Sequence, residues 1–265
     1  MTVVPMSIEI DGHSLRDGID ITSDEFYARL SQPGPRPTSS SPSPGEYLTA
    51  FREAPAGDIL CLTIPARFST MGRSARLAAE MLKEEQPGKR VEVLDTGTAA
   101  GGFTLVADAA AAACGAGLAL ERVTAYTVDV ARSARVIAAL DTMRFLVRSG
   151  RVPALAGLGS DLLHVRPVFA FSGGDVQRLA LVRGTKRALR VVAESLRERV
   201  PTDIPVRLAV FCGDVPAAVP ALIGSLRDLF GDRPIERLNL TPVMALHTGP
   251  GLIGAAAVAD LPLLD

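Results

Sequence analysis

Hydroxyl-bearing residues gather in two loops of this chain, and a histidine lies beside glycines near its end. One loop reads Thr-Ser-Ser-Ser at 38–41, another places Ser69 directly after an apolar segment, and His247 precedes Gly249. Loops at the carboxyl ends of parallel strands form the ligand crevice of a sheet, so we expect Ser69 to lie there. Hydroxyls together with a histidine suit an anion such as a carboxylate. The same side chains also serve as helix caps and turn residues, and this alternative stays open.

Other sequence signals of chemistry are absent or lack their context. The three cysteines and three histidines form no CxxC, HExxH or HxH pattern, so a metal site is not expected. Residues 249–254 match GxGxxG by letter, but no acidic residue follows about 20 positions later, as a dinucleotide site requires. The chain has neither a GxxxxGK[ST] phosphate loop nor the GxSxG of a hydrolase.

Composition restricts the class of protein further. The 265 residues are 48% hydrophobic and 22% charged, which predicts a folded core and room for one large unit or two domains. A net charge of −1 argues against a nucleic-acid partner. No segment of about 20 residues is apolar enough to span a membrane, and no leader opens the chain, so we expect a cytoplasmic protein.

The hydrophobic pattern of the first half alternates between strand and helix. Residues 3–10 read as a strand, and Ser43, Pro44 and Glu46 form a capping box with proline at the first helical position. Expected strands and helices then follow one another at 58–64, 72–85, 90–94, 99–114, 120–131 and 135–140. Strands separated by helices indicate a parallel sheet, so residues 1–148 are predicted to form an α/β domain.

The second half has a different pattern. A hairpin is expected over 165–182, turning at Ser172 to Asp175, and residues 184–199 are expected to form a helix. The remaining expected elements are a strand at 206–211, a helix at 216–230, and strands at 235–240 and 243–246. Residues 149–265 are therefore predicted to form an α+β domain with a mixed or antiparallel sheet.

Several segments, in one order along nearly the whole chain, carry a family resemblance. They include PTSSSPSPGEYLTAF (37–51), ILCLTIPARFSTMGRSARLA (59–78), VLDTGTAAGG (93–102) and LHTGPGLIG (246–254). These segments resemble the DegV family of bacterial fatty-acid-binding proteins. The resemblance implies an α/β first domain and an α+β second domain, with one acyl chain buried between them.

The resemblance also implies which residues hold the ligand. The carboxylate-binding positions of the family correspond to Thr38, with Ser39 beside it, Ser69 and His247, and its two arginines to Arg151 and Arg183. Two features depart from the family pattern. The family opens with a strand before VVP, so this first domain is expected to lack that strand, and a family glycine is replaced by Thr70.

The resemblance implies a role as the acyl-carrying partner of a separate fatty-acid kinase. The kinase phosphorylates the bound carboxylate, and the product feeds phospholipid synthesis. The chain would then hold no catalytic residue, need no cofactor beyond its long-chain fatty acid, and contact a membrane surface only transiently. Two alternatives stay open. Ser69 and His247 could be the nucleophile and base of a hydrolase or phosphotransferase, or the chain could carry another amphiphilic acid.

Overall fold

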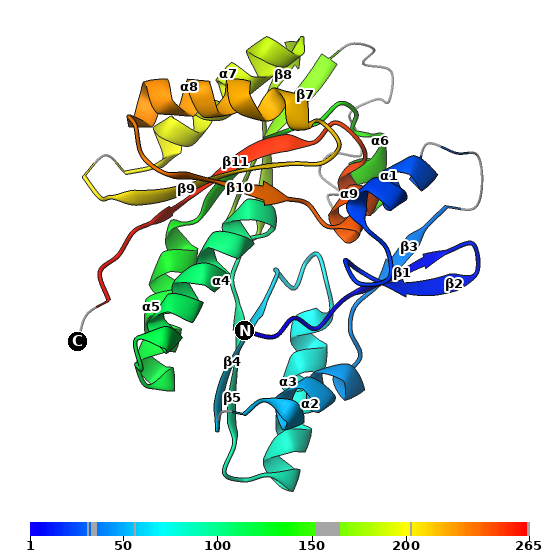
Figure 1. Cartoon of the computed structure of the whole chain (residues 1–265), viewed down its shortest axis with the longest axis vertical. Helices are drawn as coiled ribbons and strands as arrows, with labels where there is room; N and C mark the ends of the chain where they lie inside the picture. The colour runs from blue at the N-terminus through cyan, green and yellow to red at the C-terminus, as the bar shows by residue number, and fades with distance from the viewer. Residues whose placement is uncertain (31, 33–35, 56, 152–164, 202, 264–265) are drawn as a thin grey trace.

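A six-stranded mixed sheet is the largest element of the computed structural model, which describes residues 1–30, 32, 36–55, 57–151, 165–201 and 203–263 (Figure 1). The strand order is β10-β9-β11-β6-β7-β8, where only β10 and β9 run parallel. The strands are β6 (Arg135–Ala139), β7 (Val165–Ser172), β8 (Asp175–Arg183), β9 (Val206–Cys212), β10 (Ile235–Asn239) and β11 (Ile253–Ala259).

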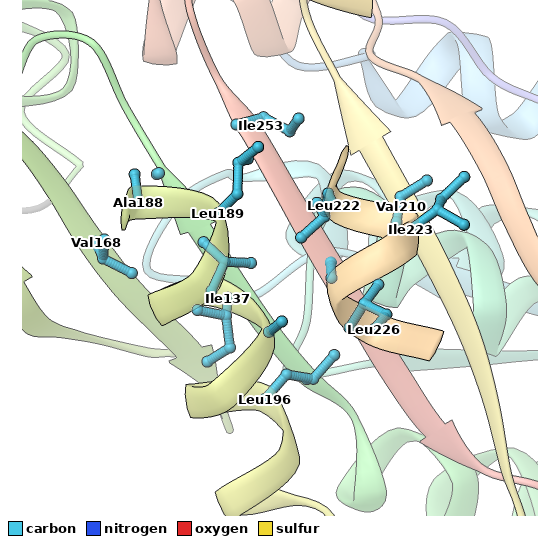
Figure 2. Packing of buried hydrophobic residues seen from close by; sticks show 14 of the residues in the cluster. Ile137, Val168, Ala188, Leu189, Leu196, Val210, Leu222, Ile223, Leu226 and Ile253 are labelled. Carbon is cyan, nitrogen blue, oxygen red and sulfur yellow. The ribbon is translucent and has the colours of Figure 1, made fainter. Parts of the chain in front are cut away.

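Helices cover both faces of this sheet (Figure 1). On one face, α7 (Thr185–Arg199) and α8 (Val219–Phe230) bury leucines and valines against β6, β9 and β11 (Figure 2). A short 3-10 turn at Pro216–Ala218 leads directly into α8. On the other face lie α4 (Ala100–Gly115) and α5 (Leu120–Ser133). Both faces of each central strand are therefore apolar, as in a sheet buried between two helical layers.

A two-stranded parallel sheet with its own helices forms a second body of packing. β4 (Asp58–Thr63) pairs with β5 (Arg90–Asp95), and α2 (Pro44–Glu53) and α3 (Met71–Glu85) pack together beside them. The predicted capping box at the start of α2 is confirmed, because the Ser43 hydroxyl accepts the Glu46 N–H and the Glu46 carboxylate accepts the Ser43 N–H.

The N-terminal segment of the chain and residues 242–248 meet in a third body of packing. β1 (Ser7–Ile10) pairs antiparallel with β2 (His13–Arg16) and with β3 (Thr38–Ser40). α1 (Ser23–Leu30) and α9 (Pro242–Thr248) pack on this small sheet, and α6 (Arg144–Arg148) contacts α9. A cluster of buried side chains from these elements includes Ile8, Phe26 and Leu246.

The predicted fold class, α/β with a parallel sheet and a mixed sheet, is confirmed, but individual elements differ. Residues 243–246 were expected to form a strand and instead lie in α9, where Pro242 supplies the fixed backbone angle that suits a first helical turn. The sequence also predicted no strand after them, whereas β11 lies at the centre of the sheet. β6 was expected to belong to the parallel sheet of the first domain, but it pairs antiparallel with β11 and β7. The domain boundary expected after residue 148 therefore lies between β6 and β7, which are neighbouring strands of one sheet.

Neither a membrane span nor a metal cluster is found in the part of the chain that the structure describes. None of its helices combines the length and the apolar character needed to cross a bilayer. No group of histidine, cysteine, aspartate and glutamate side chains there is arranged to hold a metal ion.

Close packing around β11 predicts that Gly254 tolerates no side chain. A methyl group at Gly254 would overlap the Phe211 ring and lie 2.6 Å from the Ile137 carbonyl oxygen. We expect Gly254→Ala to lower the free energy of unfolding by about 1–3 kcal/mol in urea titrations. Gly224→Ala on α8 is the control, since a methyl group there meets nothing and should stabilise the helix by about 0.5–1 kcal/mol. Equal effects of the two substitutions would contradict this account.

Candidate functional site

An apolar cavity of about 660 Å³ lies against the face of the six-stranded sheet that carries α4 and α5. Its size is that of a small-molecule site. The sheet contributes alternate residues of neighbouring strands to its wall, because side chains one residue apart point to opposite faces. On the side of the sheet the wall includes Val136, Ala138, Leu140, Phe169, Phe171 and Phe211.

Polar side chains from four segments line the same cavity. The Ser39 hydroxyl lies 3.0 Å from Nε2 of His247, and the Ser41 hydroxyl lies 2.8 Å from that of Ser69. Arg151, which follows α6, also lines the cavity, and its positive charge acts on His247. We call Ser39, Ser41, Ser69, Arg151 and His247 the polar cluster.

Backbone pairing and helix packing place each member of the first hydrogen-bonded pair. Ser39 lies opposite Ile8 in the β1–β3 ladder, so its side chain is half-buried while those of Thr38 and Ser40 are exposed. His247 lies in the last turn of α9, and its neighbour Leu246 is buried against β1 and α1. The small apolar cluster therefore fixes the distance between Ser39 and His247.

Ser69 is positioned by the start of α3. Residues 65–69 leave β4 in a tight turn, in which the Ser69 N–H donates to the Pro65 carbonyl. The Ser69 oxygen accepts the backbone N–H of Met71 at 3.3 Å, and its hydroxyl pairs with Ser41. Ser69 thus has the local role of a helix-start residue and also faces the cavity.

The imidazole of His247 is held in its neutral form. Burial, and secondly the positive charge of Arg151, lower the pKa of His247 to about 4. Its Nδ1 is buried and has no hydrogen-bond partner among the described residues. At neutral pH the cluster therefore carries one fixed positive charge, that of Arg151, and an uncharged histidine.

Counting hydrogens shows that the polar cluster can donate to a ligand. Ser39 and neutral His247 have one O–H and one N–H between them, and the bond that joins them uses one of these. When Nε2 carries the proton it donates to Ser39, and the Ser39 O–H remains available for a ligand; in the other tautomer the remaining hydrogen is on the buried Nδ1. The Ser41–Ser69 pair likewise keeps one free O–H. Two donors and a guanidinium beside an apolar wall suit a ligand with an anionic head and an apolar body.

Comparison with known proteins identifies the family. The family model described as "Uncharacterised protein, DegV family" matches residues 1–260. This chain belongs to the DegV family. It is 31% identical over 262 residues to a DegV domain-containing protein of Deinococcus radiodurans, covering 97% of this chain and 90% of that protein.

Solved structures of similar proteins have the same fold. A DegV family protein from Thermus thermophilus, described for its fatty acid binding, is 32% identical with a TM-score of 0.85 over 97% of this chain and 91% of its own. The Streptococcus pneumoniae Fatty Acid Kinase (Fak) B3 protein, loaded with linoleic acid, has a TM-score of 0.87 at 23% identity. That likeness covers 97% of this chain and 90% of the other, and it shows the fold.

The structure brings together four of the six site residues expected from the DegV resemblance. Ser39, Ser69, Arg151 and His247 all line the cavity. Thr38 is exposed on β3 and Arg183 is exposed at the end of β8, and neither is among the residues that line it. Ser69 and His247 are not partners of each other, because each is hydrogen-bonded to a different serine.

Two parts of the site were not predicted. Ser41 was recognised as one hydroxyl of its loop but not as the partner of Ser69. The phenylalanines of the wall were not assigned at all, although Phe169 and Phe171 lie two residues apart in a strand and so share a face. This alternation could have predicted the phenylalanines of the wall, because Ala170 between them and Val168 beside them pack on the other face of the sheet.

The low pKa of His247 predicts a pH-dependent stability that its replacement removes. Since the folded protein binds this proton more weakly than the unfolded chain, the stabilisation is complete above pH 6.5 and is lost as pH falls toward 4. His247→Gln cannot titrate. We expect wild type to lose up to about 3 kcal/mol more unfolding free energy than this variant between pH 7 and pH 4. Parallel urea titrations measure the difference, and identical pH profiles would contradict a buried neutral histidine.

Proposed function

We propose that this protein binds one long-chain fatty acid in the apolar cavity and presents its carboxylate to a separate fatty-acid kinase. The observation that carries the proposal is a single cavity that joins an apolar wall to the polar cluster. Such a space fits an amphiphilic chain better than a polar metabolite, which would leave its own polar groups without partners along the wall.

The apolar wall supplies the driving force for binding. Each methylene transferred from water to such a surface contributes about 0.8 kcal/mol, so a chain of about 14 methylenes contributes about 11 kcal/mol before costs. Binding also costs several kcal/mol, because the acyl chain loses translational freedom and rotation about its bonds. The remaining free energy supports tight binding that depends on chain length.

The polar cluster supplies what the carboxylate needs. A carboxylate next to an apolar wall without hydrogen-bond donors would cost several kcal/mol. Ser39 with His247, and Ser41 with Ser69, offer two hydrogens, and Arg151 offers a compensating charge. Binding an anion beside His247 would also favour its protonated form and raise its pKa from about 4.

The relatives support both halves of the proposal. The Thermus thermophilus protein is described for fatty acid binding, and the Streptococcus pneumoniae protein is described as the Fatty Acid Kinase (Fak) B3 protein loaded with linoleic acid. In the proposed reaction a carboxylate oxygen forms a bond to the γ-phosphorus of the nucleoside triphosphate on the kinase. The bond from that phosphorus to the bridging oxygen breaks, and a nucleoside diphosphate leaves. This chain would contribute binding and orientation, and the kinase would contribute the catalytic groups.

Neighbouring hydroxyls on β3 provide a direct test of the head-group site. Ser39→Ala removes a donor to a charged acceptor, which costs about 1.5–3 kcal/mol and weakens fatty-acid affinity about tenfold to a hundredfold. Thr38→Ala changes an exposed hydroxyl that is not among the residues lining the cavity, and this variant should bind as wild type does. Titration with a fluorescent fatty acid after delipidation measures both affinities. A loss confined to Thr38→Ala would instead favour the residue expected from the family pattern.

Bound lipid and phosphoryl transfer can be measured separately. We expect protein expressed in bacteria to carry one long-chain fatty acid per chain, detected by native mass spectrometry. With a bacterial fatty-acid kinase and ATP, His247→Gln should lower the rate of acyl-phosphate formation more than it lowers fatty-acid affinity, because charge develops on the carboxylate oxygens during transfer. Folded protein without lipid that also fails to bind added fatty acid would contradict the proposal.

A further inference from the structure

A second cavity, of about 670 Å³, has the opposite character to the first. Four arginines line it, namely Arg29 at the end of α1, Arg36 before β3, and Arg144 and Arg148 of α6. Asp11 is the one carboxylate among its described lining residues. We call this space the basic cavity.

Among the described residues, three of the four arginines have no carboxylate partner. Arg29 forms an ion pair with Asp11 at 3.1 Å. Arg36, Arg144 and Arg148 take part in none of the ion pairs found between described residues, which engage ten different arginines, Arg29 included. The lining of the basic cavity therefore carries an excess of positive charge.

The excess charge is concentrated and held in place. The guanidinium groups of Arg144 and Arg148 lie 5.3 and 5.1 Å from the centre of the Phe145 ring. Phe145 is buried against α9, where its ring fills the space beside Gly249. Partial burial and the charges of Arg36 and Arg144 lower the pKa of Arg148, as expected when like charges crowd together. An anion in the cavity would relieve this repulsion.

The basic cavity and the polar cluster share two chain segments. Residues 36 and 37 line the basic cavity, and two residues later Ser39 faces the apolar cavity. In the same way α6 contributes Arg144 and Arg148 to the basic cavity, while Arg151 just beyond it belongs to the polar cluster. The two cavities therefore neighbour each other across β3 and α6, but the residues that line them are different.

We propose that the basic cavity is a binding site for a phosphate-bearing anion, distinct from the fatty-acid site. Guanidinium groups bind phosphate oxygens in pairs, and three arginines that form no ion pair within the described part of the chain suit a group with two or more negative charges. The volume lies within the range of small-ligand sites and admits a diphosphate with an attached group. Such a group could be supplied by a soluble nucleotide or by a phospholipid headgroup, since both present the same chemistry.

Calorimetric titration with inorganic pyrophosphate and with ADP tests the site in solution. We expect saturable binding that weakens as salt is added. The double substitution Arg144→Gln with Arg148→Gln should lower the affinity about tenfold or more, and Arg36→Gln, from a separate segment, should lower it too. The matched control is Arg187→Gln with Arg190→Gln, two exposed arginines of α7 outside both cavities, which should bind as wild type does.

Vesicle flotation distinguishes the two sources of phosphate. Wild type and the same variants are mixed with phosphatidylcholine vesicles that contain or lack phosphatidylglycerol. Binding to pyrophosphate or ADP that the α6 substitutions weaken supports a soluble ligand, and flotation with phosphatidylglycerol that they weaken supports a headgroup. Melting temperature and fatty-acid affinity should be unchanged in all variants. The proposal is overturned if wild type binds none of these probes, or if the α6 variant and the α7 control bind them equally.

Discussion

Ser39 and His247 lie 208 residues apart in the sequence, and only packing between the N-terminal segment and α9 brings them within 3.0 Å. That packing buries Ile8 and Phe26 against Val243 and Leu246, and each such side chain contributes about 1.5–3 kcal/mol on burial. Two hydrogen bonds fix the approach, because Ser23 donates to the Leu240 carbonyl and the Val243 N–H donates to the Asp17 carboxylate. The polar end of the apolar cavity therefore exists only when β1, β3 and α9 are all in place.

The walls of that cavity depend on a different constraint, namely that the large sheet is covered on both faces. Ile137 and Val168 pack under α7, which leaves their neighbours Val136 and Phe169 to face the cavity. The sheet cannot move into the apolar space, because its far face is held by α7 and α8 and its near face by α4 and α5. A ligand site of this size needs such support, since protein interiors otherwise close to the density of crystals.

Local signals in the sequence predicted local structure well. The capping box at Ser43 and the hairpin of β7 and β8 follow from neighbouring residues, and both are present. The family resemblance assigned both Thr38 and Ser39 to the ligand, and only Ser39 lines the cavity. Which of the two does so depends on the register between β1 and β3, which neighbouring residues do not determine. β11 was missed because glycine and alanine fill most of its length, so its strand character comes from β6 and β9 on either side.

The position of β11 also determines the order in which the protein can be completed. It lies between β9 and β6 and follows both in the chain, so the two halves of the large sheet have no common neighbour until residues 253–259 have been synthesised. Before that point β6 and β9 present unpaired edges, which are sites of mispairing and aggregation. A nascent chain that stops short of residue 253 is therefore left with open strand edges and an unsupported cavity wall, so folding of this sheet is a late event in synthesis.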